Sequence, residues 1–585
     1  MKKTFTKLAG GIMAASMILG TAGVAAPQVF ADDTAQTTTT AISAVKADTF
    51  ALTVTKNAKD KGTHTYTAYQ IFSADVTNSK FVNVVWGDDV TQASMNAKAA
   101  EIAAAIGCAE ADIKTGNDVD AVKLAEKIGT LSAAATVDQG ETTAYTTGTD
   151  KDKAIALSKV LEQCVDKTKG TVIGDDTEVK TGYYLITDAL TDSTTSKPGE
   201  NVGSISKLIL TPVMEDTDVT VKSSVPEVQK KVKDINDSTE KTLSDWKDSA
   251  DYDGTDVIPY QLTATLGEGL ENYKNYYLAF NDTMCEGLTF NPESVKIFVN
   301  GEEVEASLFN FSSADVTEGT YKGGKKYTWE QSNILAGATK KGSTDKVEIG
   351  SGSVIVIEYT ATLNDKAVSG KVGNPNEVTL KYSSNPNDDQ GGTPKETPED
   401  KNIVFTYDVD VNKYCKENGV RKDLEGAQFS LYKVIKLKDG ETKPANAPTV
   451  EGITLANDEY LKKIDLDVNG AKFSAKQVDD GLYYVVEDKA PDGYNKLANP
   501  VIPFVVDAEH TDGDNPQLVQ FNNQTDGFSY TVDTGLISTD VENKSGTQLP
   551  STGGIGTTIF YIVGAAAAVT AIVLLTTRRR ANKED

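Results

Sequence analysis

The sequence predicts a mostly-β protein built of sandwich domains in tandem. Threonine, valine, aspartate, glycine and tyrosine are plentiful in the 585 residues, and segments of alternating apolar and polar residues recur along the chain. Helical periodicity is confined to two stretches, roughly 93–106 and 150–165. Alternation with a period of two is the pattern of half-buried strands, so strands should dominate.

The first 31 residues are predicted to be a secretory signal peptide. Lysines at the start precede a run of apolar and small residues from Leu8 to Ala26, and Val29-Phe30-Ala31 supplies the small-x-small pattern of a cleavage site. Cleavage is expected after Ala31, which makes this an exported protein.

The exported chain is too long for one hydrophobic core and should divide into about three domains. Changes in composition place these at 48–221, 226–384 and 403–545. Residues 385–402, with prolines and a glycine pair among acidic residues, have the composition of a linker. The formal net charge of -27 argues against nucleic acid as a partner.

Cysteine and histidine are rare. Cys108 and Cys164 fall in one predicted domain and could pair, whereas Cys285 and Cys415 fall in different domains and are expected to be free. The two histidines, His64 and His510, stand apart from any cysteine or carboxylate cluster in the sequence. We therefore expect surface histidines, no metal site, no cofactor and no histidine-based catalytic triad.

The C-terminus contains a membrane stop signal. The apolar run 555–577 is long enough to cross a hydrocarbon core, and the basic tail 578–585 should remain in the cytoplasm. The segment 549–553 stands directly before this span. Its residues are Leu549, Pro550, Ser551, Thr552 and Gly553.

Alternation also places polar residues among apolar ones on the inner faces of predicted strands. Lys413 shares a face with Val409 and Val411, and Asn543 shares one with Ile537 and Val541.

The middle domain repeats this arrangement. Lys230 lies between Val228 and Val232, Asn376 precedes Val378, and Asp282 follows Phe280 on one face. Lys231, Asn374 and Glu358 are neighbours that could replace these three.

These motifs resemble those of Gram-positive surface proteins. The order of pentapeptide, apolar span and basic tail resembles an LPxTG cell-wall sorting signal. Residues 483–494 resemble the "E-box" of Gram-positive pilins and of the B-type repeats of collagen adhesins, and residues 424–432 look like the second-strand signature of the same domains. The middle domain resembles the isopeptide-forming domain of fimbrial backbone subunits. Together they imply tandem immunoglobulin-like β-sandwiches and a major pilin of a sortase-assembled pilus.

In that family a buried lysine and asparagine form an intramolecular amide, assisted by an acid. The resemblance implies the pairs Lys413–Asn543 with Glu487, and Lys230–Asn376 with Asp282. Burial disfavours the ammonium form of lysine and the ionised form of the acid, which leaves an amine nucleophile and a proton shuttle. The alternatives are a Lys413–Glu487 salt bridge and an Asp282 that only ends its strand.

The first domain departs from this pattern. Lys56 alternates with Leu52 and Val54, and residues 182–188 echo the E-box. Thr187 stands where the third domain has Glu487, and the closing strand near 208–213 offers no inward asparagine. We expect no amide here, and hence the domain that unfolds most easily.

The same resemblance predicts how copies are joined. A sortase would cut between Thr552 and Gly553 and pass the threonine to Lys222 of the next copy, although Thr220-Val221-Lys222 departs from the usual Tyr-Pro-Lys. A linker lysine without a role is the alternative. The expected partners are a sortase, other copies of this chain, accessory pilins, a peptidoglycan precursor and a possible host ligand, with membrane contact only before cleavage.

The predicted function is therefore structural: the backbone of a covalent cell-surface fimbria that supports adhesion. A monomeric wall-anchored adhesin that binds a host matrix protein is the alternative. An enzyme is not expected, because outside the proposed amide sites the sequence offers no nucleophile, metal or paired-carboxylate constellation.

Overall fold

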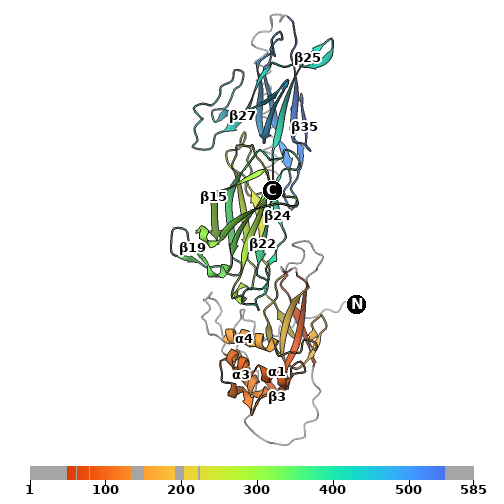
Figure 1. Ribbon diagram of the computed structural model, residues 1–585, viewed down its shortest axis with the longest axis vertical. Coiled ribbons are helices and arrows are strands. Elements are labelled where there is room, and N and C mark those ends of the chain that lie inside the picture. The colour runs from red at the N-terminus through yellow and green to blue at the C-terminus, as the bar shows by residue number, and fades with distance from the viewer. Residues whose placement is uncertain are drawn as a thin grey trace, which may run out of the picture.

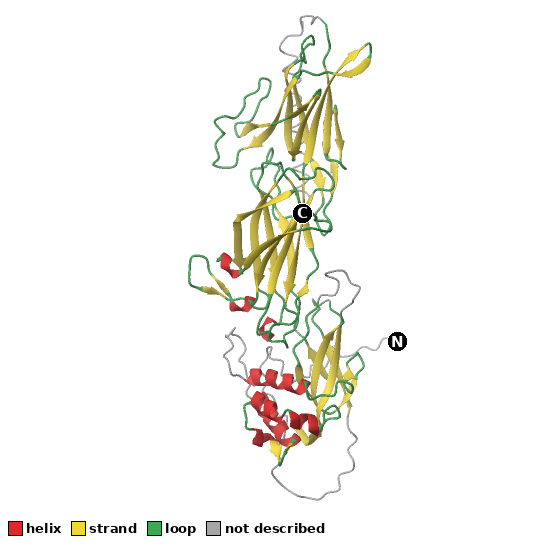
Figure 2. Ribbon diagram, in the orientation of Figure 1, coloured by secondary structure: helices red, strands yellow, loops and turns green. Residues whose placement is uncertain are grey.

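The computed structural model describes residues 49–546 except 59, 61, 78–79, 134–149, 192–202 and 222–223. Figure 1 shows three bodies stacked in chain order along the long axis of the molecule. The first mixes helices with strands, whereas the other two consist almost entirely of strands (Figure 2). The predicted mostly-β architecture is confirmed.

The first body has two sheets and a group of helices. One sheet has the order β3-β2-β8-β9, with β6 beside β2, and the other has the order β10-β1-β7. The strands are β1 (Thr49–Thr55), β2 (His64–Thr77), β3 (Lys80–Trp86), β6 (Thr171–Val172), β7 (Glu178–Lys180), β8 (Gly182–Leu190), β9 (Ile209–Val213) and β10 (Thr217–Thr220), with a small hairpin of β4 (Lys114–Thr115) and β5 (Asp118–Val119).

The helices of this body are α1 (Gln92–Ala97), α2 (Ala99–Ile106), α3 (Ala121–Ala133) and α4 (Asp150–Glu162), with a 3-10 turn at Glu110–Ile113. Thr91 caps α1, since its hydroxyl accepts a hydrogen bond from the Ser94 amide at 3.1 Å. Gly107, in the left-handed conformation, ends α2. Helix α3 was not anticipated from the sequence; Leu124 and Ile128 bury its apolar side against the other helices and the sheet.

The second body is a sandwich of two large sheets. Their strand orders are β11-β13-β21-β15-β16 and β12-β24-β22-β14-β18-β17, with β23 beside β22, and a small hairpin β19-β20 lies apart. The bounds are β11 (Glu227–Val232), β12 (Ser249–Asp251), β13 (Ile258–Thr265), β14 (Leu278–Met284), β15 (Leu288–Val299), β16 (Glu302–Val304), β17 (Asn310–Asp315), β18 (Lys325–Gln331), β19 (Ala338–Thr339), β20 (Lys346–Val347), β21 (Val354–Leu363), β22 (Asn374–Tyr382), β23 (Lys395–Glu396) and β24 (Asp400–Phe405), with 3-10 turns at Leu270–Asn272, Ala306–Leu308 and Ile334–Ala336.

The third body is a second sandwich. One sheet has the order β29-β30-β25-β36-β35 with β26 beside β25, the other β28-β27-β31-β32, and β33 pairs with β34. The bounds are β25 (Tyr407–Glu417), β26 (Val420–Asp423), β27 (Gln428–Lys436), β28 (Glu459–Ile464), β29 (Asp467–Asn469), β30 (Lys472–Val478), β31 (Gly481–Lys489), β32 (Val501–Val506), β33 (Ala508–His510), β34 (Leu518–Phe521), β35 (Phe528–Thr531) and β36 (Leu536–Glu542).

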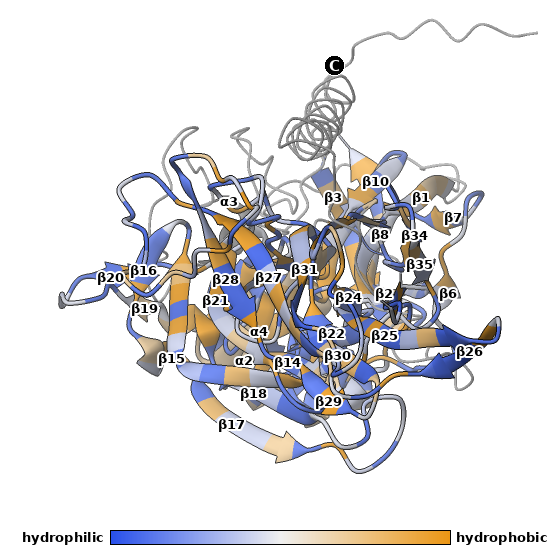
Figure 3. Ribbon diagram, turned by 90° about the horizontal axis from the view of Figure 1, so that it is seen from above, coloured by the Kyte–Doolittle hydropathy of each residue, from blue (hydrophilic) through white to orange (hydrophobic). Residues whose placement is uncertain are grey.

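Alternating burial along the strands builds these cores. In β13 and β21 every second side chain is buried, and Figure 3 shows the matching bands of hydrophobic and hydrophilic residues along several strands. The core of the second body gathers residues such as Leu262, Phe280 and Ile357, and that of the third gathers Val409, Val485 and Phe504. The burial of these side chains is the main stabilising contribution.

The expected linker 385–402 is folded in the structure. Its second half forms β23 and the start of β24, and β24 pairs with both β22 and β12. Glycines 391 and 392 have positive φ values and only make turns. Strand pairing therefore overrides the linker composition. The connection to the third body is instead a single residue, the fully buried Thr406, which separates β24 from β25.

Within the described residues, no helix is both long and apolar enough to cross a membrane. The predicted span 555–577, the sorting motif 549–553, Ala31 and Lys222 lie outside them.

Candidate functional site

The sandwich interior of the second body holds a lysine, an aspartate and an asparagine from three strands. Lys230 on β11, Asp282 on β14 and Asn376 on β22 are all fully buried. The Lys230 Nζ donates to Asp282 Oδ2 at 2.8 Å. β11 belongs to one sheet and β14 and β22 to the other, so the three side chains meet between the two layers.

Tyr359 on β21 links these groups. Its hydroxyl lies 2.8 Å from the Lys230 Nζ and 2.9 Å from Asn376 Nδ2, both of which donate to it, and it donates to Asp282 Oδ2 at 2.5 Å. The Lys230 Nζ also lies 5.3 Å from the ring centroids of Tyr260 and Tyr359. The acyl oxygen Asn376 Oδ1 is buried and accepts no hydrogen bond from the described residues.

Burial sets the charge state of this site. Loss of solvation lowers the pKa of Lys230 and outweighs the opposing charge of Asp282. The same loss raises the pKa of Asp282, against the lysine and the tyrosine hydrogen bond. A neutral amine beside a neutral carboxylic acid is the state that these two directions favour.

The third body contains a similar group. Lys413 on β25 and Glu487 on β31 are fully buried, and Asn543, directly after β36, is 1% exposed. The Lys413 Nζ lies 2.9 Å from Glu487 Oε1. Asn543 Nδ2 donates to Glu487 Oε2 at 3.4 Å and to the Asn495 carbonyl at 2.8 Å.

The surroundings of Lys413 are apolar. Its Nζ lies 5.6 Å from the ring centroid of Phe429, and burial lowers its pKa even though Glu487 opposes that change. Apart from their mutual ion-pair contact, Lys413 Nζ and Glu487 Oε1 have no hydrogen-bonding partner among the described residues, and neither has the buried Asn543 Oδ1. Unsatisfied polar atoms in a core are costly, which makes a reactive role more reasonable than a purely structural one.

The neighbouring residues that could have replaced the middle set point elsewhere. Lys231 pairs with Asp248, Asn374 donates to the carbonyl groups of Val368 and Val404, and Glu358 accepts from Gln261. The structure thus brings together Lys230, Asp282 and Asn376 rather than these neighbours.

Sequence reasoning missed Tyr359 and the groups that hold Glu487. Alternation along β21 places Tyr359 on the same inner face as Ile355 and Ile357. The direction of its hydroxyl toward Lys230 depends on how β21 pairs with its neighbours, which the sequence pattern does not show. The Leu497 amide, which donates to Glu487 Oε2 at 2.8 Å, lies in a loop after β31 and gives no sequence signal.

Among its described residues, the first body has no counterpart of these groups. The Lys56 Nζ donates to the Gly62 carbonyl at 2.7 Å. Thr187 on β8 stands opposite Thr67 of β2.

The expectation that both histidines lie at the surface was wrong. The His64 side chain is 3% exposed and sits between Asp60 and Asp188, with Nδ1 2.9 Å from Asp188 Oδ1. The His510 side chain is 9% exposed, and its Nε2 lies 3.8 Å from Asp234 Oδ2. Carboxylates distant in the sequence provide partners that make burial of both rings possible.

All four cysteines are free thiols, so Cys108 and Cys164 are not paired. The Cys164 thiol donates to the Val160 carbonyl within α4 and the following turn, and burial raises its pKa to about 11. No disulfide reinforces the described part of the chain.

Two family models match the C-terminal half. Residues 408–523 match a prealbumin-like fold domain, and residues 541–584 match the LPXTG cell wall anchor motif. The first covers most of the third body, and the second includes the predicted sorting pentapeptide, the apolar span and all but the last residue of the basic tail.

Two curated proteins are similar in sequence. The trypsin-resistant surface T6 protein of Streptococcus pyogenes serotype M6 is 26% identical over 394 residues, which cover 59% of this chain and 67% of that protein. Fimbrial subunit type 1 of Actinomyces viscosus is 31% identical over 156 residues, 24% of this chain and 26% of that protein.

Two solved pilin structures align with this chain at low identity. The T6 backbone pilin of Streptococcus pyogenes aligns over 86% of this chain and 100% of its own, with 17% identity and a TM-score of 0.46. The full-length major pilin SpaD of Corynebacterium diphtheriae aligns over 86% of this chain and 98% of its own, with 13% identity and a TM-score of 0.43.

Proposed function

We propose that this chain is a cell-wall-anchored backbone pilin, that its copies form a covalent polymer and that two internal amides lock each copy. Its role is structural: it is a substrate of sortase rather than an enzyme that turns over an external substrate. Sortase would join Thr552 of one copy to Lys222 of the next.

The observation that carries the amides is the repeated geometry of the two buried sites. In each, a lysine whose pKa is lowered by burial contacts a carboxyl group within 2.9 Å. The side-chain amide of Asn376 donates to the Tyr359 hydroxyl, and that of Asn543 donates to Glu487. In both sites the acyl oxygen of the asparagine accepts no hydrogen bond from the described residues.

The chemistry follows from these contacts. The ammonium group first gives a proton to the neighbouring carboxylate, so that the lysine nitrogen carries a lone pair. That nitrogen attacks the Cγ of asparagine while the carboxylic acid donates its proton toward the acyl oxygen. Proton transfer to the amide nitrogen then lets ammonia leave. The acyl oxygen returns its proton to the carboxylate as the carbonyl re-forms. One C–N bond forms and one breaks, and the carboxyl group ends protonated because it keeps the proton that the ammonium gave it at the start.

The positions of the two proposed amides explain how they would stabilise each sandwich under a pulling force. Lys230 lies on the first strand of its sandwich and Asn376 on a strand of the opposite sheet. β25 and β36 are parallel neighbours that begin and end the third sandwich. An amide in each place would carry a pulling force past the intervening chain. It would also restrict the unfolded chain, by on the order of 4 to 5 kcal/mol for loops above roughly 100 residues.

The position of Lys222 suits polymerisation. It falls between β10, which ends at Thr220, and β11, which begins at Glu227, at the junction of the first two bodies. In the proposed reaction a sortase cysteine forms a thioester with the Thr552 carbonyl and releases Gly553. The Lys222 amine of another copy then takes the acyl group, and a peptidoglycan precursor takes it in the last copy.

Intact mass measurement of the mature chain tests the amides. Each amide loses one ammonia, so we expect a deficit of about 34 Da, with peptides linked between Lys230 and Asn376 and between Lys413 and Asn543. Asp282→Asn and Glu487→Gln should each restore about 17 Da at one site. Glu358→Gln, which changes a carboxylate outside both sites, should leave the deficit intact. A chain of full calculated mass would refute the amides.

A second experiment tests polymerisation alone. In cells that express the matching sortase, Lys222→Ala should abolish the high-mass ladder of wall extracts. Lys180→Ala, which removes an exposed lysine paired with Asp88, should leave the ladder unchanged. An intact ladder in the Lys222 variant would instead favour a different acceptor or a monomeric wall-anchored adhesin.

A further inference from the structure

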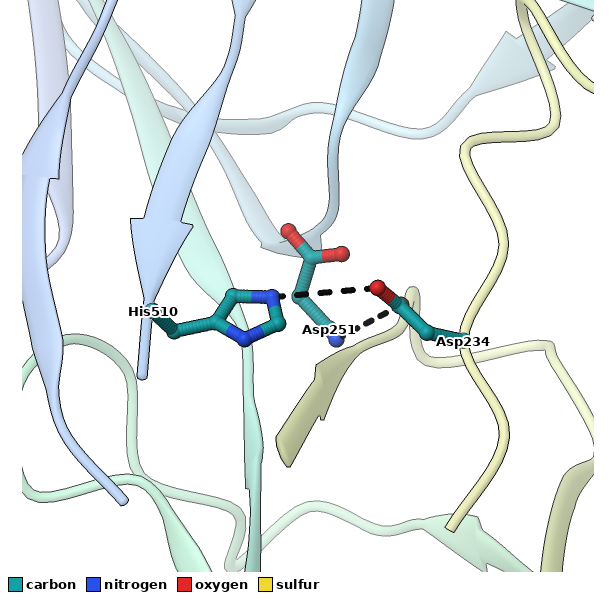
Figure 4. Close-up of side chains that lie close together, drawn as sticks. All are labelled: Asp234, Asp251 and His510. Carbon is teal, nitrogen blue, oxygen red and sulfur yellow. Dashed lines mark hydrogen bonds and ion pairs between the residues drawn. The ribbon is translucent and has the colours of Figure 1, made fainter. Parts of the chain in front are cut away.

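A histidine and two aspartates converge where the second body meets the third. Asp234 follows β11, Asp251 ends β12, and His510 ends β33. One ligand atom of each lies within 4.8 Å of the other two. Figure 4 shows the His510 ring directed toward the Asp234 carboxylate, with Asp251 beside both. The residues come from two bodies, which distinguishes this group from the amide sites.

The hydrogen bonds of His510 fix which ring nitrogen faces the aspartates. Ser249 Oγ donates to the Thr511 carbonyl at 2.9 Å, so its only hydrogen is used there. The 2.6 Å contact between Ser249 Oγ and His510 Nδ1 must therefore be donated by Nδ1. In the neutral ring, Nε2 then carries a lone pair toward Asp234. A histidine whose other nitrogen is held in this way is the usual form of a metal ligand.

The spacing of the oxygen and nitrogen atoms also suits an ion. His510 Nε2 and Asp234 Oδ2 are 3.8 Å apart, too far for a hydrogen bond. Two ligand atoms bound at about 2.0–2.2 Å to one tetrahedral zinc ion are separated by roughly 3.3–3.6 Å. The His510 nitrogen and the Asp234 oxygen would therefore need to move only slightly closer to bind the same ion.

The surroundings of this group are rich in buried carboxylates. Asp251 is 1% exposed, its carboxylate accepts from the Asp480 amide at 3.2 Å, and Asp480 is itself 5% exposed. The nearby Tyr407 hydroxyl is fully buried and lies beside the Asp251 carboxylate. Carboxylates buried this close to one another are costly unless a cation or a proton offsets their charge.

We propose that this junction binds a divalent transition metal, such as zinc, through His510 Nε2, Asp234 and Asp251, and that the ion fastens the second body to the third. Imidazole nitrogen with carboxylate oxygen is a donor set that zinc accepts and that calcium, which prefers oxygen alone, does not. The proposal departs from our sequence expectation of no metal, because the three residues are brought together only by the packing of the two bodies. It does not depend on the pilus function.

A second acidic group provides an internal comparison. Asp253, Asp256 and Asp479 also approach within 4.8 Å of one another. There, however, Lys462 pairs with Asp253, and Lys433 pairs with Asp479 and Asp237, each at 2.5 Å. Two ammonium groups already occupy the positions that a cation would take, so we expect no ion in that group.

Zinc binding to the mature chain, stripped with a chelator, tests the proposal. We expect one zinc ion per chain by elemental analysis after dialysis against micromolar zinc. His510→Gln should abolish this binding, and Ser249→Ala, which frees the Nδ1 contact, should weaken it about tenfold. Asp256→Asn, in the lysine-filled group, should bind zinc as the wild-type chain does. Loss of binding in Asp256→Asn with retention in His510→Gln would overturn the assignment.

Spectroscopy of the metal bound to the wild-type chain tests the site without depending on variants that could fail to fold. Cobalt should give the absorption bands of a four-coordinate ion, and zinc X-ray absorption should show a nitrogen and oxygen shell that includes one imidazole. Zinc should also raise the unfolding temperature of the wild-type chain and of Asp256→Asn, but not of His510→Gln. Absence of stoichiometric binding, or a shell without imidazole, would refute the site.

Discussion

Among the residues that the structure describes, three lysines are fully buried, and their neighbours give them different chemical states. Lys230 and Lys413 each face one carboxyl group, and burial lowers the pKa of both. Lys433 is as deeply buried, yet the charges of Asp479, Asp237 and Asp253 outweigh the loss of solvation and hold its pKa above the usual range. A buried lysine beside a single carboxyl group can lose its proton and react as an amine. A buried lysine beside three carboxylates stays an ammonium ion and forms ion pairs with them.

His64 provides a pH prediction at the same scale. Burial alone would lower its pKa, but hydrogen bonds and charge from Asp188 and Asp60 raise it to about 9, from an ordinary value of 6.5. A pKa raised on folding adds stability below pH 6.5 that is lost as pH rises through about 9. The unfolding temperature of the first body should therefore fall between these pH values.

His64→Gln should be less stable at neutral pH and should largely lose this dependence, as measured by thermal unfolding across the pH range. A wild-type curve that stays flat through pH 9 would contradict the assignment. His510→Gln is the matched control, because it removes the other histidine and leaves the first body unchanged.

At the scale of elements, two turns fasten the second body to the third. Gly370 in the second body and Gly535, just before β36, both have positive φ, and their backbones pack directly against each other. A Cβ on Gly370 would lie 2.3 Å from the Gly535 nitrogen. The Gly370 amide also donates to the carbonyl of Thr406, the single residue between β24 and β25.

Gly370→Ala should therefore loosen this junction. Gly352→Ala is the control, since Gly352 has a φ of 74° but no atom within 4 Å of the place that an alanine Cβ would take. Both changes carry the cost of a left-handed alanine, about 1 kcal/mol. Only Gly370→Ala adds a backbone clash, so we expect at least about 1–3 kcal/mol of further destabilisation in denaturant unfolding. Equal losses in the two variants would contradict a packed junction.

At the scale of the whole molecule, the three bodies differ in how they should bear load. Two contain the proposed amides, and they meet through a buried one-residue connection. The first contains the α-helices, and its described residues include no candidate amide. The stack in Figure 1 is thus expected to be stiff over two bodies and extensible in one.

Single-molecule pulling on the mature chain tests this expectation. The first body should unfold and extend, while the second and third should show no full-length extension because the amides hold their strands. Lys413→Ala should add one unfolding event with the contour length of the third body. Lys416→Ala, an exposed lysine on the same strand, should not. Extension of all three bodies in the wild-type chain would refute the locking role.

Linear signals in the sequence determined a large part of this description. The sorting signal is read from contiguous residues, and alternation is a local property of a strand, so the inner faces that hold Lys230, Asp282 and Lys413 could be predicted. Glu487 was predicted only from the resemblance of residues 483–494 to the E-box. The mostly-β class followed from the same pattern.

Only the tertiary structure decided which inner faces meet. Strand register placed the Tyr359 hydroxyl between lysine and asparagine, sheet pairing turned the expected linker into β23 and β24, and packing of two bodies gathered His510, Asp234 and Asp251. Contacts between residues more than a hundred positions apart depend on the free energy of the whole packed chain, which leaves no periodic trace in the sequence. Local pattern therefore determined which side chains point inward, and long-range packing decided their chemistry.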